Sequence, residues 1–332
     1  MPVRLLSRIG WLLLLATLAP GCTGPAPPSP VPGYRLIDLM PRYWAFRDST
    51  ADTPVSERPA AFRRIVLAAE PRFYAQVFPV PDDARLGGYL AMLEPIDPVV
   101  RRVADETRDA IPVAMARLRQ VVPALGSGAR IYLVPSLFNS NGQVRYLDDS
   151  LVVMLGPDVQ AYVEVHVDSG RRADPIPTIV HELAHWHHWR TNPEIGRAAA
   201  TFFKPGSYAP LYYNLWSEGL ATYVARIANP EVALADVLGP GVRPAEGPQL
   251  LPRLAAEFLG RLESTAEDDV RDLFYLSGRR TDLPLRSAYY VGYRVVERLA
   301  RERSLAELLR LDGRELREGM RAALTALAAG QP

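Results

Sequence analysis

The chain has 332 residues, of which 48% are apolar and 23% are charged, the proportions of an ordinary globular protein with a buried core. Its net charge is +1, from 38 basic and 37 acidic residues, and this balance argues against nucleic acid as a partner. The single cysteine, Cys22, excludes an intramolecular disulfide.

The N-terminal segment has the pattern of an export signal followed by a spacer. Two arginines precede the apolar stretch 9-IGWLLLLATLA-19, which is too short to span a bilayer comfortably. The segment 18-LAPGC-22 resembles a bacterial lipobox, in which residues 1–21 are a signal peptide and Cys22 is lipidated. Residues 22–33 would then be a proline-rich spacer. The resemblance implies an exported envelope protein, lipid-anchored to a membrane and facing the periplasm; an ordinary cleaved signal or an uncleaved anchor is the alternative.

Hydrophobic periodicity divides the rest of the chain into helices, a small sheet, and helices again. Two segments, about 57–78 and 83–123, are predicted to be mainly helical, and Pro112 is expected to kink or divide the second. Strands are predicted at 131–134, 151–155 and 162–168, with turn residues at 138–143. From Asp174 onward helices are predicted, apart from the proline- and glycine-rich stretch 238–251.

This order of elements predicts an α+β fold that is mainly helical. We expect residues 34–126 to form an N-terminal helical region. Residues 127–332 should hold the small sheet and the later helices, and 34–332 together should form one compact unit.

Four of the five histidines lie in the segment 177-PTIVHELAHWHHWRT-191. Asp174 followed by proline is a favourable helix opening. At 100° per residue, His181, Glu182 and His185 share one side of the helix, and apolar side chains occupy the other. Two imidazoles one turn apart can reach a single Zn²⁺ ion, and the glutamate can reach a water on that ion. The pattern therefore predicts metal-assisted hydrolysis with Glu182 as the general base.

The other histidines are less suited to ligation. His187 points away from the zinc side, and His166 is expected at an exposed strand position. His188 lies on the zinc stripe one turn beyond His185, where a role in supporting the ligands is favoured over direct ligation. The metzincin pattern is excluded, because its third histidine would stand at Thr191 and its glycine at His188.

The third ligand is predicted in the helical segment 214-NLWSEGLATYVARIAN-229. Beside Glu218 stand small residues, among them Ala221 and Thr222, which allow the two helices to approach closely. Glu218 would complete a set of two imidazoles and one carboxylate and leave a fourth zinc position for water. Thr222 is expected to support Glu218 from behind, and the alternative is a solvated helical glutamate.

His-Glu-Leu-Ala-His at 181–185, followed by Ser-Glu-Gly-Leu-Ala at 217–221, resembles the gluzincin metallopeptidases, which have a zinc-binding HExxH helix and a downstream glutamate helix. The chain is similar in particular to bacterial predicted zinc-dependent proteases with the pattern W-x-E-G-x-A-x-Y, although Ser217 stands where asparagine is common. The resemblance implies a zincin-like, thermolysin-like catalytic region at 127–332, one Zn²⁺ per chain, and a peptide or protein substrate.

The resemblance also implies a side chain that stabilises the oxyanion. The segment 286-RSAYYVGYRVVERLAR-301 is similar to the family's tyrosine-x-x-glycine element, which points to Tyr289 with Gly292. Tyr290 is the alternative, and both tyrosines could instead be ordinary core residues.

The function predicted is a zinc-dependent peptidase. A substrate peptide could lie along the edge of a strand at 162–168 or 151–155. The alternatives are a non-catalytic envelope lipoprotein that keeps a peptidase fold for binding or scaffolding, and metal-dependent hydrolysis of something other than a peptide.

Overall fold

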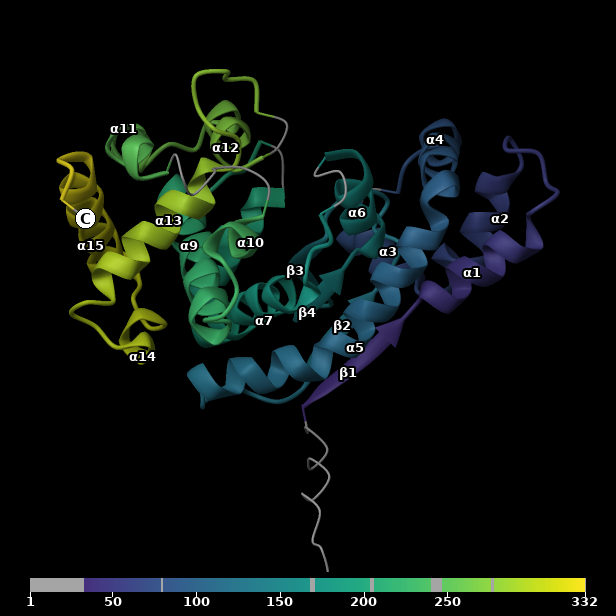
Figure 1. Cartoon of the computed structure of the whole chain (residues 1–332), viewed down its shortest axis with the longest axis horizontal. Helices are drawn as coiled ribbons and strands as arrows, with labels where there is room; N and C mark the ends of the chain where they lie inside the picture. The colour runs from purple at the N-terminus through teal and green to yellow at the C-terminus, as the bar shows by residue number, and fades with distance from the viewer. Residues whose placement is uncertain are drawn as a thin grey trace, which may run out of the picture. The chain divides into compact units, whose positions relative to one another are not determined.

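The computed structural model describes residues 33–78, 80–167, 171–203, 206–239, 247–275 and 278–331. Residues Pro32–Pro332 form one compact unit, mainly helical with a single four-stranded sheet, which confirms the α+β class (Figure 1). The predicted signal peptide, Cys22 and the spacer up to residue 32 lie outside the described residues. Within the described ranges, no helix combines the length and the hydrophobicity needed to cross a bilayer.

The sheet has the strand order β1-β2-β4-β3, with bounds β1 (Tyr34–Asp38), β2 (Ala129–Leu133), β4 (Ser150–Leu155) and β3 (Gly142–Leu147). Strand β2 pairs in parallel with both β1 and β4, whereas β3 runs antiparallel to β4. A tight turn at Asp148 and Asp149 joins β3 to β4, and both residues have the positive φ that such hairpin turns require. The strand predicted at 151–155 is therefore internal, and β3 is the edge strand on its side of the sheet.

The prediction of a strand at 162–168 is wrong. Helix α6 (Pro157–Tyr162) continues directly into a π-helical turn, η3 (Val163–Val167). The rings of Tyr162 and His166 lie 4.6 Å apart, one helical turn from each other, and Glu164 forms an ion pair with Arg102. These contacts override the local β preference of the alternating valines. His166 is exposed, as expected, but on a helical turn.

The N-terminal region is helical as predicted, except that it begins with β1, which belongs to the same sheet as the later strands. Its helical elements are α1 (Met40–Ser49), α2 (Arg58–Ile65), η1 (Leu67–Ala69), α3 (Pro71–Val77), α4 (Asp83–Leu93), η2 (Glu94–Ile96) and α5 (Asp97–Val121). Helix α5 runs through Pro112 without being divided. Its buried stripe packs against the later helices α7 and α9.

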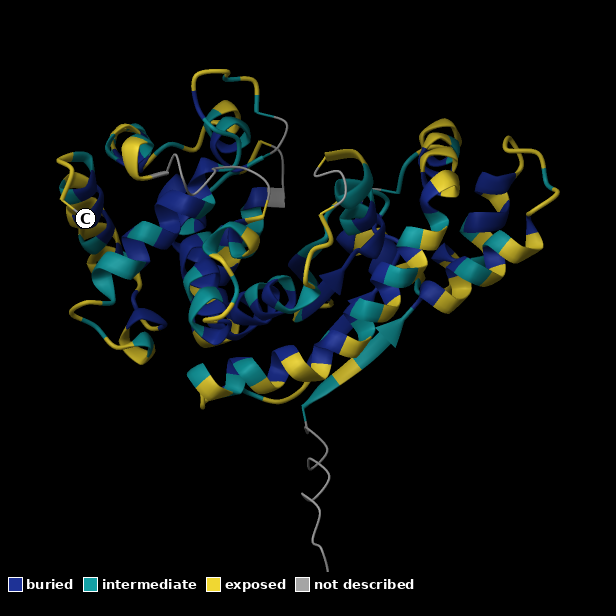
Figure 2. Cartoon of the chain, viewed as in Figure 1, coloured by how far each residue is buried: buried dark blue, intermediate teal, exposed yellow. Residues whose placement is uncertain are grey.

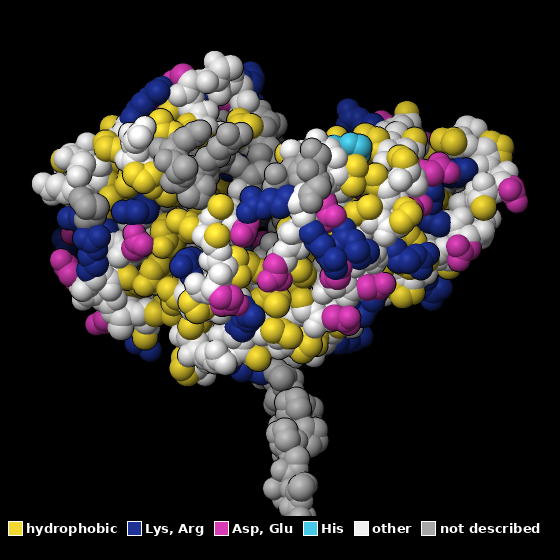
Figure 3. Space-filling model, in the orientation of Figure 1, with side chains coloured by type: hydrophobic (Ala, Val, Ile, Leu, Met, Phe, Trp, Pro, Cys, Tyr) yellow, Lys and Arg dark blue, Asp and Glu magenta, His cyan; other side chains and the backbone are white. Residues whose placement is uncertain are grey.

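In the C-terminal half, all the regular elements of the described residues are helices; residues 240–246 of the predicted proline- and glycine-rich stretch lie outside the described residues. Its elements are α7 (Pro175–Thr191), α8 (Pro193–Ala200), η4 (Thr201–Phe203), α9 (Leu211–Ala228), α10 (Leu234–Leu238), α11 (Gly247–Arg261), α12 (Glu267–Phe274), α13 (Ser287–Leu299), α14 (Leu305–Leu308) and α15 (Gly313–Ala328). Helix α7 packs against β3, β4, α5 and α9, and α9 packs in turn against α13. Both α7 and α9 are largely buried, as their dark colour in Figure 2 shows. Basic and acidic side chains are interspersed over the face in Figure 3, in keeping with the balanced net charge.

Candidate metal centre

Helix α7 begins as its sequence predicts. The Asp174 carboxylate accepts a hydrogen bond of 2.9 Å from the backbone N–H of Ile176, and Pro175 occupies the first helical position. Apolar side chains including Ile179, Leu183 and Trp186 are buried on the opposite face from the motif. The helix is thereby fixed on several sides, so the motif side chains project from a rigid element.

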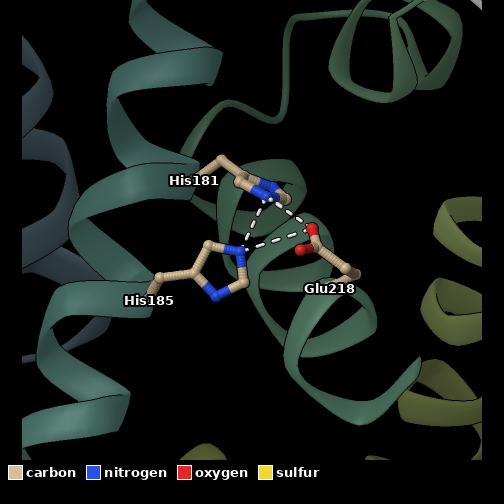
Figure 4. A group of neighbouring side chains, drawn as sticks. All are labelled: His181, His185 and Glu218. Atoms are coloured by element: carbon tan, nitrogen blue, oxygen red, sulfur yellow. Dashed lines mark hydrogen bonds and ion pairs between the residues drawn. The ribbon is translucent and has the colours of Figure 1, made fainter. Parts of the chain in front are cut away.

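Three side chains from α7 and α9 converge on one point (Figure 4). The Nε2 atoms of His181 and His185 lie 3.0 Å apart, and Glu218 Oε2 lies 3.1 Å from the first and 3.3 Å from the second. These residues form a group that could hold a metal ion. Their side chains are only 12%, 5% and 16% exposed, respectively, so each donor atom is largely removed from solvent.

The carboxylate and the imidazoles shift one another's protonation. Burial raises the pKa of Glu218, but the two imidazoles outweigh burial and hold this pKa well below its ordinary value. Burial lowers the pKa of His185, yet the Glu218 and Glu182 carboxylates raise it above 6.5. For His181 burial prevails, and its pKa is lowered. Near neutral pH the site therefore contains an ionised carboxylate and one imidazole that is readily deprotonated, which is a donor set suited to a cation.

Glu182 is adjacent to the predicted ligands but does not belong to the converging set. Its side chain is 6% exposed, and burial is the main cause that raises its pKa to about 8. Its Oε2 atom is buried and bonds no polar group in the described part of the chain. A Cβ placed on Gly142, the first residue of β3, would stand 2.8 Å from Glu182 Oε1. The carboxylate thus lies against the beginning of the edge strand and can accept a proton there.

The two candidate tyrosines have different surroundings. The Tyr289 ring stacks on His181, with ring centroids 6.1 Å apart and an interplanar angle of 25°. Burial, followed by the Glu218 charge, raises the Tyr289 pKa, so its hydroxyl stays protonated at neutral pH. Burial raises the pKa of Tyr290, and the charges that act on it are those of Arg294 and Glu297, which follow it on α13. Of the two, only Tyr289 lies beside the converging ligands.

Arg286 is a site residue that sequence reasoning missed. Its guanidinium carbon lies 4.0 Å from the centroid of the Tyr289 ring, and its charge also lowers the pKa of Glu182. Arg286 has a positive φ of 54°, which is uncommon for a residue other than glycine. In the sequence, only its position three residues before Tyr289, immediately before α13, could have indicated that Arg286 lies at the site.

The predicted supporting residues do not bond the ligand side chains. His188 is 1% exposed, and neither ring nitrogen has a hydrogen-bond partner in the described part of the chain. Burial is the first cause that lowers its pKa to about 3, so it is a neutral imidazole. The Thr222 hydroxyl donates to the backbone carbonyl of Glu218 at 2.7 Å, and so supports the helix rather than the carboxylate. Ser217 does bond a ligand ring: its hydroxyl lies 3.0 Å from His185 Nδ1.

No protein-family model, curated protein or solved structure matches this chain. What indicates a function is therefore the chemistry of the residues that the fold brings together.

Proposed function

We propose that the chain is a zinc-dependent peptidase in which His181, His185 and Glu218 hold the metal. The supporting observation is the convergence of two imidazole nitrogens and one carboxylate oxygen from two helices. Donor atoms about 2.05 Å from a tetrahedral zinc ion lie about 3.3 Å from each other. The three separations here are 3.0, 3.1 and 3.3 Å, so the site needs only small adjustments to accept such an ion.

The residues around this set fit hydrolysis by an attacking water. When bound, zinc lowers the pKa of water and polarises a carbonyl group. The charge of a bound cation would lower the raised pKa of Glu182, and its ionised carboxylate would then take the water proton and transfer it to the leaving amine. The Tyr289 hydroxyl, held protonated by its surroundings, donates a hydrogen bond to the oxyanion that develops on the substrate carbonyl. Glu182 favours a catalytic site over a binding module, because ligation alone does not require a base at this position.

Strand β3 is the proposed position for the substrate backbone. It is an edge strand, and its first residue, Gly142, lies against Glu182. An extended peptide added to this edge would gain main-chain hydrogen bonds and place a carbonyl near the base. The resemblance of 18-LAPGC-22 to a lipobox supports, in addition, a lipid-anchored location in the cell envelope.

Two variants of the purified protein test the division of roles. Glu182→Gln should bind zinc with wild-type stoichiometry, measured by elemental analysis, and lose turnover of a mixed peptide library. Glu218→Ala should lose zinc. Wild-type cleavage by Glu182→Gln would contradict the assignment of the base, and full metal affinity in Glu218→Ala would move the third ligand elsewhere. A wild-type protein that binds zinc but cleaves no peptide would favour the binding-module alternative.

A further inference from the structure

A buried serine hydroxyl holds the outer face of one predicted ligand ring. Ser217 Oγ lies 3.0 Å from His185 Nδ1 and accepts a hydrogen bond of 2.9 Å from Trp189 Nε1. All three side chains are buried. His185 and Trp189 are one turn apart on α7, with ring centroids separated by 5.5 Å. Their ring nitrogens, Nδ1 and Nε1, therefore both contact the Ser217 Oγ atom of α9.

Ser217 directly precedes Glu218, so two consecutive residues of α9 contact opposite sides of the same imidazole. Glu218 Oε2 faces His185 Nε2 at 3.3 Å, and Ser217 Oγ faces Nδ1. Rotation of the ring would break both contacts. The direction of the Nε2 lone pair is therefore set by the Ser217 contact together with the packing of the ring.

The hydrogen-bonding capacity of the three groups determines which proton His185 carries. A neutral imidazole has one N–H, and coordination through Nε2 requires that proton to be on Nδ1. Indole N–H can only donate, so Trp189 occupies one lone pair of Ser217 Oγ. The second lone pair can accept from His185 Nδ1–H when Nε2 binds a metal. In the absence of metal the hydroxyl can donate to Nδ1 instead, and Nε2–H then faces Glu218.

We infer that Ser217, held in place by Trp189, is a positioning residue that fixes the ring orientation and the tautomer of His185 for metal binding. This inference rests on the proposed zinc site. A hydroxyl can donate or accept, so it can satisfy both tautomers. Ser217→Ala would leave a buried indole N–H and a buried imidazole nitrogen without their shared partner.

The expected effect is on metal affinity. Loss of a hydrogen bond that orients a ligand typically weakens metal binding by about 10- to 100-fold, and we expect this range for Ser217→Ala, measured by chelator competition. Ser217→Thr keeps the hydroxyl and should restore affinity. Ser287→Ala is the matched control, because Ser287 is equally buried but its hydroxyl bonds no polar group in the described part of the chain. Ser287→Ala should bind zinc like the wild type.

Two spectroscopic measurements add to the metal affinities, and the first of them needs no variant. Side-chain ¹H–¹⁵N spectra of the zinc-loaded wild-type protein should show His185 protonated at Nδ1, with slow exchange of that proton with solvent. The visible spectrum of the Co²⁺ form should change in Ser217→Ala and remain unchanged in Ser287→Ala. If Ser217→Ala binds zinc like the wild type while Glu218→Ala does not, the inference is overturned and the zinc site stands. A zinc-loaded His185 that carries its proton on Nε2 would overturn both, because Nε2 is the nitrogen that faces Glu218. Failure of the wild type to bind zinc would overturn both.

Discussion

Gly219 and Gly292 meet where α9 crosses α13. A Cβ placed on Gly219 would lie 2.4 Å from the carbonyl carbon and oxygen of Gly292, and one placed on Gly292 would lie 2.6 Å from the Leu215 carbonyl oxygen. The two helix backbones are thus in direct contact. Glu218 precedes the first glycine, and Tyr289 lies one turn before the second. The crossing therefore brings the predicted carboxylate ligand and the predicted oxyanion donor to the same site.

Gly219→Ala should destabilise the fold. Alanine in a helix interior normally gains up to about 1 kcal/mol over glycine, but overpacking against rigid backbone costs about 1–3 kcal/mol. Because Gly292 is part of a helix backbone, it cannot move aside as a flexible side chain can, and the steric cost should prevail. Urea unfolding should show a lower free energy of unfolding, and separation of α9 from α13 should also weaken zinc binding.

Gly88→Ala provides the control for this prediction. Gly88 lies in the middle of α4, and a Cβ there would meet no atom within 4 Å. The same substitution should therefore raise the free energy of unfolding by about 0.5–1 kcal/mol. If Gly219→Ala is as stable as Gly88→Ala, the two helices are not in close contact.

The sequence predicted the helices of the site better than the sheet. The HExxH helix and the glutamate helix are both long and periodic, and their capping and small residues are local signals. Hydrophobic periodicity did not predict strand β1. Its residues pair with β2, which lies far away in the chain, and a local pattern carries no information about such a distant partner. The segment 162–168 was misinterpreted because alternation of valines reports a preference that tertiary contacts can override. No local pattern predicts the role of Ser217, because its contact with His185 depends on how α7 crosses α9.

Asp158 is a second residue whose role no local pattern predicts. It is fully buried and accepts hydrogen bonds from the backbone N–H of Ser136 and Phe138, the Ser136 hydroxyl and the Tyr89 hydroxyl. Phe138 has a positive φ of 56°, and these bonds hold the loop that precedes β3. Asp158→Ala leaves the donors unsatisfied and should lower the free energy of unfolding by about 3–5 kcal/mol. Asp109→Ala, at an exposed position of α5, should change it by at most about 0.5 kcal/mol.

Gly142→Ala should impair catalysis while leaving zinc binding intact. The added methyl group would stand 2.8 Å from Oε1 and Cγ of Glu182, and the carboxylate is the more mobile partner. Displacement of a reacting group by about 1 Å can cost about 100-fold in rate, so kcat/KM should fall by about 10- to 100-fold. Zinc stoichiometry should stay at the wild-type value. Unchanged kcat/KM would indicate that Glu182 is not the base, a conclusion that Glu182→Gln tests independently.

Tyr289→Phe and Tyr290→Phe distinguish the two tyrosine assignments. Each variant removes one hydroxyl and retains the ring. Loss of an oxyanion donor typically lowers kcat by about 10²- to 10³-fold, and we expect this effect for Tyr289→Phe with little change in KM. Tyr290→Phe should retain nearly full kcat, because burial raises the Tyr290 pKa and the charges that act on its hydroxyl are Arg294 and Glu297, not the predicted ligands. The reverse result would assign the oxyanion donor to Tyr290.

Zinc affinity should depend on pH mainly through His185. Coordination requires a neutral imidazole, so any histidine that is protonated must release a proton when the metal binds. The His185 pKa lies above 6.5 and the His181 pKa below it, whereas the Glu218 pKa is so low that this carboxylate stays ionised near neutral pH. As pH falls below the His185 pKa, the dissociation constant should rise about tenfold per pH unit, the slope for one displaced proton. The slope should approach two protons only at lower pH, where His181 also becomes protonated. Chelator competition between pH 5 and 8 measures the His185 slope, and an affinity independent of pH over this range would exclude His185 as a ligand whose pKa is raised by Glu218.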